Sequence, residues 1–546
     1  MEPTSKPADY RATILLPKTS FPMKADLSKR EPEIQKMWEE TDLYGRIRKA
    51  RAGKKRYLLH DGPPYANGDV HLGTGLNKIL KDIVVKFRTM QGFDAPFVPG
   101  WDCHGLPIEH KVMQEARAEG GTKTPMEIRT RCKAYAEKYI ELQRRQFKRL
   151  GVLGDWLRPY LTIDPAYEAG ILQVFAELAG KGLVERRKKP IHWCLHCRTA
   201  LAEAELEYKD DTGPSITVRM PFGPDATARL GGALKPGEKA YFLIWTTTPW
   251  TLPANVAIAA NPDADYVLVR RSAGATTEAV LCAASEPILA RVLGEAAARP
   301  EILARAKGRD LAGMTYARPY GKDPGVLVTA KYVELGEGTG LVHTAPGHGE
   351  EDYRTGLEFK LPLLSPVDAA GRFTDESPEW NGRSVFEANA PIMDDLKVRG
   401  LLSEAGTRAH SYPHCWRCKK PVIFRAAEQW FVRVCDSGLK EAALAEIERV
   451  RWVPEWGNIR IGSMMRDRPD WCVSRQRAWG VPIPAFYCET CGEPMLTRAS
   501  VEHVRAIVAI EGTDAWFLRE AAALVPPGAR CGKCKQPCAT HAPRAN

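Results

Sequence analysis

The sequence predicts an α/β fold in several domains, with a β-rich domain inserted into a nucleotide-binding domain. Three observations lead to this fold class: a strand–loop–helix–strand order near the start, strand-like runs from about residue 205, and paired cysteines at both borders of those runs. The chain of 546 residues is 44% apolar and 27% charged, the balance of a soluble multidomain protein. It contains no apolar run of membrane-spanning length and no secretory signal, so a cytoplasmic protein without a membrane partner is expected.

The first elements predict a doubly wound α/β domain. Residues 56–60 (RYLLH) are expected to form a strand, followed by the loop DGPPYANGD. Apolar residues then recur at helical spacing from Leu72 to Met90, and Gly92 is a natural stop for that helix. Another apolar stretch, APFVPGWD, follows at once. In such a domain the ligand lies where the first strand ends and the helix begins.

The stretch PYANGDVHLGT before this helix has the chemistry of a phosphate site. Gly68 and Gly73 allow the backbone to approach a ligand closely. His71 and Thr74 add side-chain donors on one face of the first turn, where helix amides favour phosphate. A nucleotide site without a Walker-type lysine loop is therefore indicated. A glycine-rich turn with a capping histidine is the alternative.

The net charge of +11 is compatible with an anionic partner and equally with a solvated basic surface. Residues 126–151 are expected to form a helix rich in Arg and Lys that ends at a glycine. Such a helix can follow a phosphate backbone, but many are only solvent-facing.

From about residue 205, five strand-like runs separated by Gly, Pro and Asp predict a separate β-rich domain. One Ala/Arg-rich stretch, Glu286 to Arg309, is expected to be helical. Past residue 421 the chain returns to mixed α/β character, with a helix expected at 437–450.

Eight of the 14 cysteines form four CxxC pairs. The pairs are Cys194/Cys197, Cys415/Cys418, Cys488/Cys491 and Cys531/Cys534. Two thiolates on one tight turn supply half of a tetrahedral zinc site, so two structural zinc ions are expected. One zinc shared by the first two pairs would clamp the neck of the inserted domain, although four pairs can combine into two sites in three ways. The other cysteines, including Cys103, are expected to be small core residues.

Several long motifs resemble the isoleucyl-type branch of the class I aminoacyl-tRNA synthetases. PPYANGDVHLGTGLNKILKD looks like the HIGH-motif region, and GWDCHGLPIEHKV (100–112) is similar to a segment that distinguishes the isoleucyl branch. WTTTPWTLPAN (245–255) and GTGLVHTAPGHGEEDY (338–353) resemble the editing domain, and SRQRAWGVPIP (474–484) also matches. The resemblance runs from about residue 20 to about residue 534.

The resemblance implies a site for isoleucine and for ATP with Mg²⁺. His71 would contact the ATP phosphates, Gly73 would leave room for the adenine, and Thr74 stands where the family motif most often has a second histidine. Isoleucine would lie near Pro64, with its ammonium group on Asp102 and with Trp479 lining the side-chain pocket. The isoleucine carboxylate would attack the α-phosphorus of ATP, and the acyl group would pass to tRNA(Ile).

The resemblance also implies a second, hydrolytic site. Isoleucine and valine differ by one methylene, worth only about 1–3 kcal/mol, a limit for which isoleucyl-tRNA synthetase is itself the standard example. A smaller pocket that hydrolyses valyl-tRNA would correct the error. The residues implied for it are Thr246, Thr247, Thr248, Asn255, His343 and Asp352. Asp352 would hold the substrate ammonium, His343 would orient the ribose or a water, and water would be the nucleophile. An ordinary threonine-rich strand is the alternative for WTTTPWT.

The resemblance gives the expected domains. They are residues 1–45 (N-terminal extension), 46–193 (first part of a Rossmann-type catalytic domain), 194–420 (zinc-clamped insertion with the editing domain at about 205–408), 421–486 (return to the catalytic domain) and 487–546 (second zinc-ribbon module and tail).

The family's lysine-rich KMSKS loop, the second half of the nucleotide-binding fold and the anticodon-binding domain have no counterpart in the sequence. The chain is therefore expected to be the first part of a synthetase. Three hypotheses follow: a ligase completed by a complementary C-terminal chain, a valyl-tRNA deacylase, or a non-catalytic tRNA-binding fragment.

Overall fold

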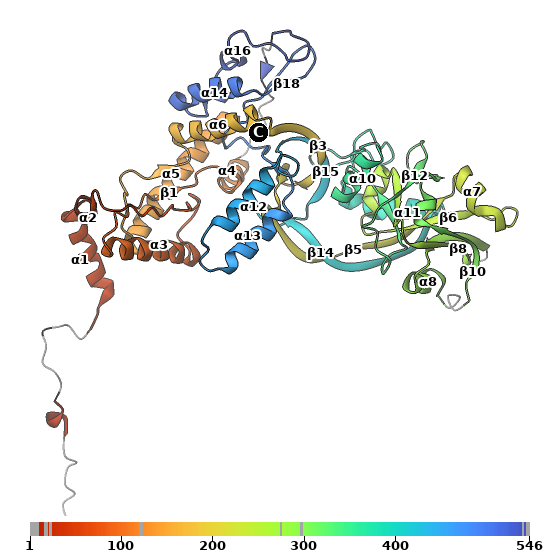
Figure 1. Ribbon diagram of the computed structural model, residues 1–546, viewed down its shortest axis with the longest axis horizontal. Coiled ribbons are helices and arrows are strands. Elements are labelled where there is room, and N and C mark those ends of the chain that lie inside the picture. Colours follow the sequence, from red (N-terminus) through yellow and green to blue (C-terminus); the bar gives the residue numbers. More distant parts are fainter. Residues whose placement is uncertain are drawn as a thin grey trace, which may run out of the picture. The chain divides into compact units, whose positions relative to one another are not determined.

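The computed structural model describes residues 10–15, 20, 24–119, 124–273, 276–294, 299–537 and 540–541. The chain divides into two compact units, whose elements are labelled in Figure 1. Residues 1–171 and 506–518 form the first unit, and residues 172–505 and 519–546 form the second. Among the described residues, no helix combines the length and apolarity needed to cross a bilayer.

The first unit is mostly helical. Its elements are η1 (Tyr10–Thr13), α1 (Leu27–Glu40), α2 (Leu43–Arg51), α3 (Leu72–Met90), β1 (Gly100–Trp101), α4 (Leu106–Ala118), α5 (Pro125–Arg149), β2 (Tyr160–Leu161), the start of α6 (Pro165–Gly180) and α15 (Ala515–Leu518). Strands β1 and β2 are parallel, with Gly100 opposite Tyr160. Helix α5 confirms the predicted basic helix: Thr124 and Glu127 form a capping box at its start, and Gly151 follows its end with φ +82°.

The strand expected at residues 56–60 is wrong as a regular element. This segment is extended but makes only one parallel bridge, from Arg56 to Asp94. The second apolar stretch, residues 95–102, offers few backbone donors for pairing with this segment, because Pro96 and Pro99 have no N–H. The apolar pattern therefore reports which side chains are buried, not whether a neighbouring strand pairs.

Helix α3 confirms the predicted helix and its stop, since Gly92 has φ +94° just after it. The face that it buries carries Gly75, Lys78, Asp82 and Val85. Six large apolar side chains at helical spacing are each more than half exposed, and we call them the α3 stripe: Leu72, Leu76, Leu80, Ile83, Phe87 and Met90. A stripe of this kind is what a helix normally packs against a neighbour.

The second unit contains a ten-stranded sheet among its described residues, in the order β10-β8-β9-β6-β13-β7-β12-β11 with β5 and β14 joined through β6. The strands are β5 (Leu206–Pro221), β6 (Ala240–Thr246), β7 (Ala257–Ala260), β8 (Asp265–Ala273), β9 (Thr276–Ala283), β10 (Glu301–Lys307), β11 (Thr315–Tyr316), β12 (Gly325–Thr329), β13 (Leu341–Thr344) and β14 (Leu402–Cys415). The helices around it are η2 (Glu203–Glu205), α7 (Pro224–Leu230), η3 (Gly231–Ala233), η4 (Pro249–Ala254), α8 (Glu286–Leu293), α9 (Gly308–Leu311), α10 (Glu350–Glu358) and α11 (Val385–Val398). Phe242, Leu268 and Leu281 lie fully buried in its core.

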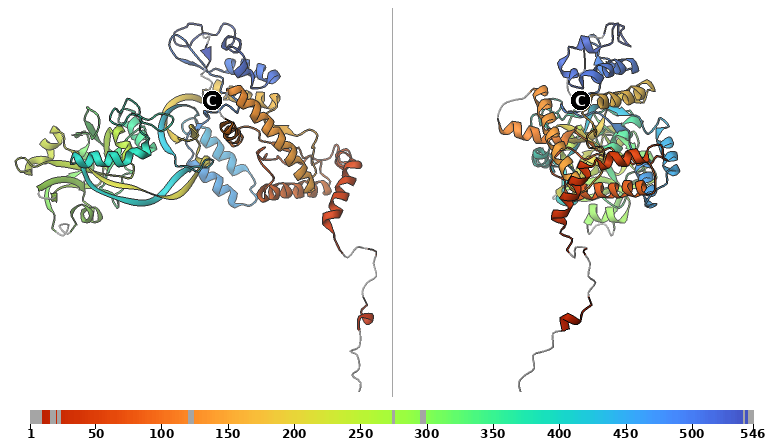
Figure 2. Two further views of the ribbon diagram at one scale, coloured as in Figure 1. Left: turned by 180° about the vertical axis from the view of Figure 1, so that it is seen from behind. Right: turned by 90° about the vertical axis from the view of Figure 1, so that its left-hand side faces the viewer.

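Two long strands lead into and out of this sheet. Strands β5 and β14 pair antiparallel along their length, from Val218 opposite Leu402 to Leu206 opposite Cys415, and they run side by side as long curved ribbons (Figure 2). We call this pair the neck. The chain thus enters and leaves the β-rich part at one place, as an inserted domain requires.

The single long helix expected from Glu286 to Arg309 is wrong. Helix α8 ends at Leu293, Gly294 follows with φ +57°, and Glu301–Lys307 forms β10 at the sheet edge against β8. Helix-favouring composition is overridden there because pairing with a neighbouring strand supplies the backbone hydrogen bonds.

Beyond the neck, the second unit has two small sheets. One has the order β16-β15-β3-β4 and the other β18-β17-β19. Their strands are β3 (Val184–Cys194), β4 (Thr199–Leu201), β15 (Ile423–Val432), β16 (Trp471–Cys472), β17 (Phe486–Tyr487), β18 (Pro494–Met495) and β19 (Thr540–His541). The remaining helices are α12 (Leu439–Arg449), α13 (Trp456–Arg466), α14 (Arg498–Glu511) and α16 (Ala521–Leu524), and α12 confirms the helix predicted at 437–450.

Candidate functional site

The loop after residue 60 begins at a buried ion pair. Asp61 accepts from Lys78 and, at 2.8 Å, from Lys81, both on α3. The Asp61 and Lys78 side chains are 0% and 1% exposed, and burial lowers the pKa of Lys78. The Gly100 N–H also points at the Asp61 carboxylate, at 3.3 Å. Asp61 thus fastens the start of the candidate nucleotide loop to α3.

Lys78→Met should destabilise the first unit by roughly 3–5 kcal/mol, because Asp61 would remain buried without its main cation. Hydrogen exchange of the α3 amides measures this. Lys86→Met is the matched control, since Lys86 pairs with Asp82 on the same helix but is about one-third exposed. We expect that control to cost less than about 1 kcal/mol. Equal destabilisation by Lys78→Met and Lys86→Met would contradict the stabilising role assigned to the Asp61–Lys78 ion pair.

A cavity of about 340 Å³ lies beside Asp61, at the end of the extended segment 56–60. None of the residues expected to bind isoleucine or ATP lines this cavity. The cavity is lined by Leu58, Leu59, His60, Asp61, Pro96, Val98, Tyr160 and Tyr167. The Tyr160 ring is stacked between His60 and Tyr167, with ring centroids 6.0 Å and 5.9 Å away.

Backbone pairing brings Pro64 and Asp102 together. The Asp102 N–H donates to Pro64 O at 2.9 Å, and the Ala66 N–H donates to Asp102 O at 2.9 Å. The Asp102 carboxyl is half-buried, and desolvation raises its pKa. The structure therefore places the two residues that were expected to hold isoleucine on adjacent backbone segments.

Sequence reasoning missed the residue that holds this loop in place. Gln143 of α5 is buried and donates from Nε2 to Tyr65 O at 3.1 Å and to Gly68 O at 2.9 Å, while its Oε1 accepts from Trp101 Nε1 at 3.0 Å. It joins the loop to β1. The only signal in the sequence was a polar residue on the apolar side of a basic helix.

His71 is the N-cap of α3. Its Nδ1 accepts from the Thr74 N–H at 3.3 Å, so Nε2 carries the proton of the neutral ring and donates to Thr74 Oγ1 at 2.9 Å. A Cβ on Gly73 would lie 3.1 Å from the His71 ring, closer than an ordinary contact. Both His71 and Thr74 stand at the helix start, where phosphate is favoured.

Thr74→His should bind ATP more tightly than the natural protein, by roughly fivefold at pH 6, because an imidazolium adds a positive charge beside the phosphates. The gain should fade by pH 8, since an ordinary histidine has a pKa of about 6.5. Thr74→Asn, which adds no charge, is the control. Titration with ATP at both pH values measures the effect, and equal or tighter binding by the natural protein would contradict it.

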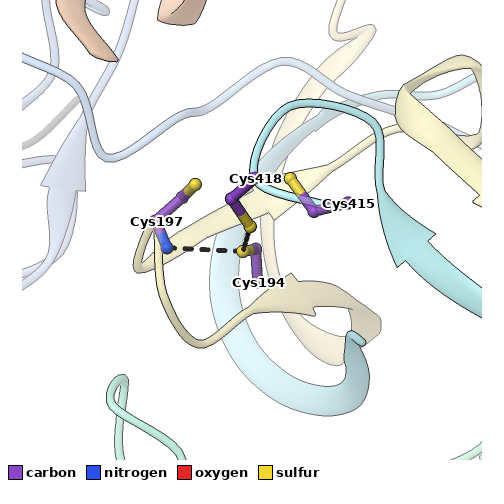
Figure 3. A group of neighbouring side chains, drawn as sticks. All are labelled: Cys194, Cys197, Cys415 and Cys418. Carbon is purple, nitrogen blue, oxygen red and sulfur yellow. Dashed lines mark hydrogen bonds between the residues drawn. The ribbon is translucent and has the colours of Figure 1, made fainter. Parts of the chain in front are cut away.

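The first cysteine cluster lies at the base of the neck. Cys194 ends β3 and Cys415 ends β14, and with Cys197 and Cys418 their Sγ atoms all lie within 4.8 Å of one another. Figure 3 shows the four side chains converging from two turns, with Cys194 and Cys418 Sγ 3.5 Å apart. Four thiols at this spacing fit a tetrahedral Zn²⁺ ion.

The second cluster contains Cys488, Cys491, Cys531 and Cys534. The structure thereby selects one of the three pairings that the sequence left open. Backbone N–H groups, led by that of Cys491, lower the pKa of Cys488, whereas the pKa of Cys491 and of Cys534 is raised within the same cluster.

All four CxxC turns share one conformation. The residue after the second cysteine has a positive φ in each: Arg198 (51°), Lys419 (59°), Gly492 (68°) and Lys535 (62°). Three of these are not glycine, so the left-handed backbone is an unusual and repeated feature. The same local turn therefore aims every pair of thiols at its cluster.

The loop that carries Trp479 packs on the first cysteine turn. Gln476 accepts from the Ala200 N–H at 3.1 Å, and Arg477 donates to Cys197 O. Trp479 is buried, at 3% exposed, and belongs to the second unit, whereas Asp102 belongs to the first. The pocket role of Trp479 stays a prediction.

The threonines expected in the second site lie at the end of β6. Thr246 is buried, and its Oγ1 lies 3.2 Å from Thr248 Oγ1 and accepts from the Thr248 N–H at 3.1 Å. Thr247 is half-buried beside them. Their hydroxyls are held by the turn that leads from β6 into η4.

His343 is buried and engaged on both ring nitrogens. Its Nδ1 accepts from Asn255 Nδ2 at 2.8 Å, so Nε2 donates to Thr251 Oγ1 at 2.9 Å. Burial lowers the pKa of His343 to about 3, which keeps the ring neutral. Thr251 in turn donates to Thr248 O at 2.8 Å, and Asn255 Oδ1 accepts from Tyr316 at 2.5 Å. Sequence reasoning missed Thr251 and Tyr316, because neither stands out in its strand or turn.

Asp352 lies in the first turn of α10. One carboxylate oxygen accepts from the Ala345 N–H at 2.8 Å, and burial raises its pKa to about 6. A half-buried carboxylate with a single backbone donor has the capacity to bind a cation. Thr246, His343 and Asp352 all lie in the second unit.

Comparison with known proteins decides the family. A family model described as tRNA synthetases class I (I, L, M and V) matches residues 33–537. The chain belongs to this class I synthetase family. The synthetase chain is 50% identical over 527 residues to an isoleucine--tRNA ligase of Kosmotoga olearia, and 50% identical over 528 residues to one of Thermotoga neapolitana.

These alignments cover 96% of this synthetase chain but only 55% and 56% of the two relatives, so the chain spans about half their length. Among solved structures, the ternary complex of Agrobacterium radiobacter K84 agnB2 LeuRS-tRNA-LeuAMS matches 95% of the chain at 16% identity and a TM-score of 0.37. A match this weak supports no residue-level comparison.

Proposed function

We propose that the chain is the part of an isoleucine--tRNA ligase that binds isoleucine and the ATP phosphates and carries the editing unit. Relatives that are 50% identical bear that name. The observation that carries the proposal is the half-buried Asp102 carboxylate, backbone-paired to Pro64 next to the loop that ends at His71. Its burial suits an ammonium partner, and the helix start suits phosphate.

In the proposed reaction, the isoleucine carboxylate attacks the α-phosphorus of ATP and pyrophosphate leaves. Asp102 holds the isoleucine ammonium near Pro64, and the pocket role of Trp479 stays a prediction from the resemblance. His71 and Thr74 face the phosphates, whose oxygens Mg²⁺ neutralises when bound, and Gly73 leaves room for the adenine. The acyl group then passes to the 3′ end of tRNA(Ile). Positioning and charge stabilisation suffice for both steps.

Isoleucine-dependent exchange of pyrophosphate into ATP tests this reaction. The chain alone should exchange very slowly, because it spans only about half the length of the related ligases. Exchange should appear when the complementary C-terminal part of a related ligase is added, and it should be lost again in Asp102→Ala. Exchange that does not depend on Asp102 would refute the assignment.

The α3 stripe supports a complementary chain as partner. Relatives are nearly twice as long as the alignment, and six apolar side chains of α3 are more than half exposed. We propose that the C-terminal part of the ligase covers this stripe. Leu80→Glu with Ile83→Glu should therefore abolish complementation, whereas Asn77, an exposed polar residue of α3 outside the stripe, should tolerate Asn77→Glu. Complementation that survives the double change would refute this occupant.

The second unit supports a hydrolytic editing function, which also forms the alternative hypothesis of a separate deacylase. Asp352 would hold the ammonium of a valyl ester, and the hydroxyls of Thr246, Thr247 and Thr248 would hold the ester and a water. His343 is neutral and bonded to Asn255 and Thr251, so we expect it to orient these groups through Thr251. Because its pKa is lowered to about 3 and its lone-pair nitrogen is occupied by Asn255, His343 is a weak base, which favours water held by hydroxyls as the nucleophile.

We propose that each cysteine cluster binds one structural Zn²⁺ ion, supported by the thiol distances and the shared turn geometry. The neck supports the domain borders near residues 205 and 408, and we propose that the ten-stranded sheet is the editing domain and that residues 46–193 are the first part of a Rossmann-type catalytic domain. Binding of tRNA without either activity would leave only the hypothesis of a non-catalytic fragment.

A further inference from the structure

A buried polar network in the first unit reaches the loop that carries Asp102. Glu168, in the first turn of α6, is 3% exposed. One of its oxygens lies 3.2 Å from His104 Nε2. The same carboxylate accepts from the Thr513 N–H at 2.8 Å and from Thr513 Oγ1 at 2.6 Å. The carboxylate therefore joins two segments that are far apart in the sequence.

Arg129 fixes the direction of these hydrogen bonds. Its guanidinium is buried, donates to Thr513 Oγ1 at 2.6 Å and to Asp514 Oδ1 at 2.5 Å, and lies over the Phe517 ring at 4.6 Å. Because the Thr513 hydroxyl accepts from Arg129, its proton is directed to Glu168. A carboxylate held in this way has little freedom to rotate.

His104 transmits this placement to Asp102. The two residues are separated by Cys103, and the His104 N–H lies 3.4 Å from Asp102 Oδ1. Cys103 is itself held, since its N–H donates to Thr162 Oγ1 at 2.9 Å. Gly105 then turns the chain with φ +93° into α4. His104 thus lies against Glu168 through its ring and against the Asp102 carboxylate through its backbone N–H, which links the two carboxylates.

We propose that Glu168 and Thr513 are positioning residues for isoleucine binding, because they hold His104 and through it the carboxylate of Asp102. This inference rests on the proposed function, in which Asp102 binds the isoleucine ammonium. The residues around the turn at Gly512 thereby have a role in the amino-acid site, although they follow α14 and are more than 400 residues from Asp102 in the sequence. A purely structural attachment would not need a buried carboxylate, since apolar packing serves as well.

The test compares two ligands in four proteins. Isoleucine and 2-hydroxy-3-methylpentanoate, which lacks the ammonium group, are titrated into the natural chain, Thr513→Val, Thr513→Ser and Glu168→Gln. Thr513→Val and Glu168→Gln should weaken isoleucine binding roughly tenfold and leave the hydroxy acid within about twofold, because only isoleucine uses the charge on Asp102. Thr513→Ser should restore natural binding, since it keeps the hydroxyl.

Asp82→Asn is the control for general destabilisation. Asp82 is another buried carboxylate of the first unit, which accepts from the Leu153 N–H at 3.0 Å. The Asp82→Asn variant should leave the ratio of the affinities for isoleucine and the hydroxy acid unchanged. Equal weakening of both ligands by Thr513→Val, or unchanged isoleucine binding, would overturn the inference.

Hydrogen exchange separates failure of this inference from failure of the proposed function. If the natural chain bound neither ligand, the proposed function would be refuted. The amides of residues 100–106 should still exchange faster in Thr513→Val than in Thr513→Ser. Identical exchange in those two variants would overturn the positioning role by itself.

Discussion

Replacing Cys415 by serine is expected to remove one of two zinc ions and to open the base of the neck. Cys415 is the last residue of β14 and pairs with Leu206, the first residue of β5. Its cluster therefore holds together the end of one neck strand and the start of the other. Structural zinc contributes about 10–16 kcal/mol to folding in small zinc-finger peptides, and we expect the loss here to be the largest of any single substitution.

Elemental analysis and hydrogen exchange measure this loss together. The natural chain should contain two zinc ions and Cys415→Ser one, with faster exchange of the amides near residues 206–212 and 409–415. Cys435→Ser is the matched control, because Cys435 is exposed and lies outside both clusters. Two zinc ions retained in Cys415→Ser, or faster exchange in Cys435→Ser as well, would contradict the clamp.

Asp352→Ala is expected to lower the hydrolysis of valyl-tRNA(Ile) roughly a hundredfold. The variant would lose the charged contact between the Asp352 carboxylate and the substrate ammonium, worth about 1.5–3 kcal/mol. Each 1.4 kcal/mol changes the rate by a factor of about ten. Glu351→Ala is the control, because Glu351 is its acidic but exposed neighbour on α10. The initial rate of valine release measures both variants, and comparable losses in the two would argue against a specific role for Asp352.

The same carboxylate predicts a pH dependence. Burial raises its folded pKa from 3.8 to about 6, so it is increasingly protonated as the pH falls below about 6. Hydrolysis should fall over that range, because the neutral acid no longer attracts an ammonium group. The sign for stability is the opposite: the contribution of this group is fully present below pH 3.8 and is lost as the pH rises through about 6. A rate that rises on acidification would contradict the assigned role.

Features with a local signal could be predicted from the sequence. The CxxC spacing identified the four cysteine pairs, since a tight turn already places two sulfurs together. The helical period from Leu72 to Met90 predicted a helix, and the strand-like runs after residue 205 predicted strands. Only the pairing of Cys194 with Cys415 needed the structure, because it depends on where the neck strands meet.

Features that depend on a distant partner could not be predicted. Residues 56–60 have the composition of a strand but one bridge, and residues 301–307 have the composition of a helix but pair with β8. Gln143 and Glu168 look like ordinary polar residues of helices, yet each is buried because a segment elsewhere in the chain supplies its partners. A single sequence has no signal for such contacts.

The relative rates of valyl-tRNA(Ile) and isoleucyl-tRNA(Ile) hydrolysis by this chain test the central claim most directly. An isoleucine-type ligase with a complete editing unit should release valine at least about tenfold faster than isoleucine. The one-methylene difference is worth about 1–3 kcal/mol, for which isoleucyl-tRNA synthetase is itself the standard example. Equal release of the two amino acids, or faster release of isoleucine, would contradict the account.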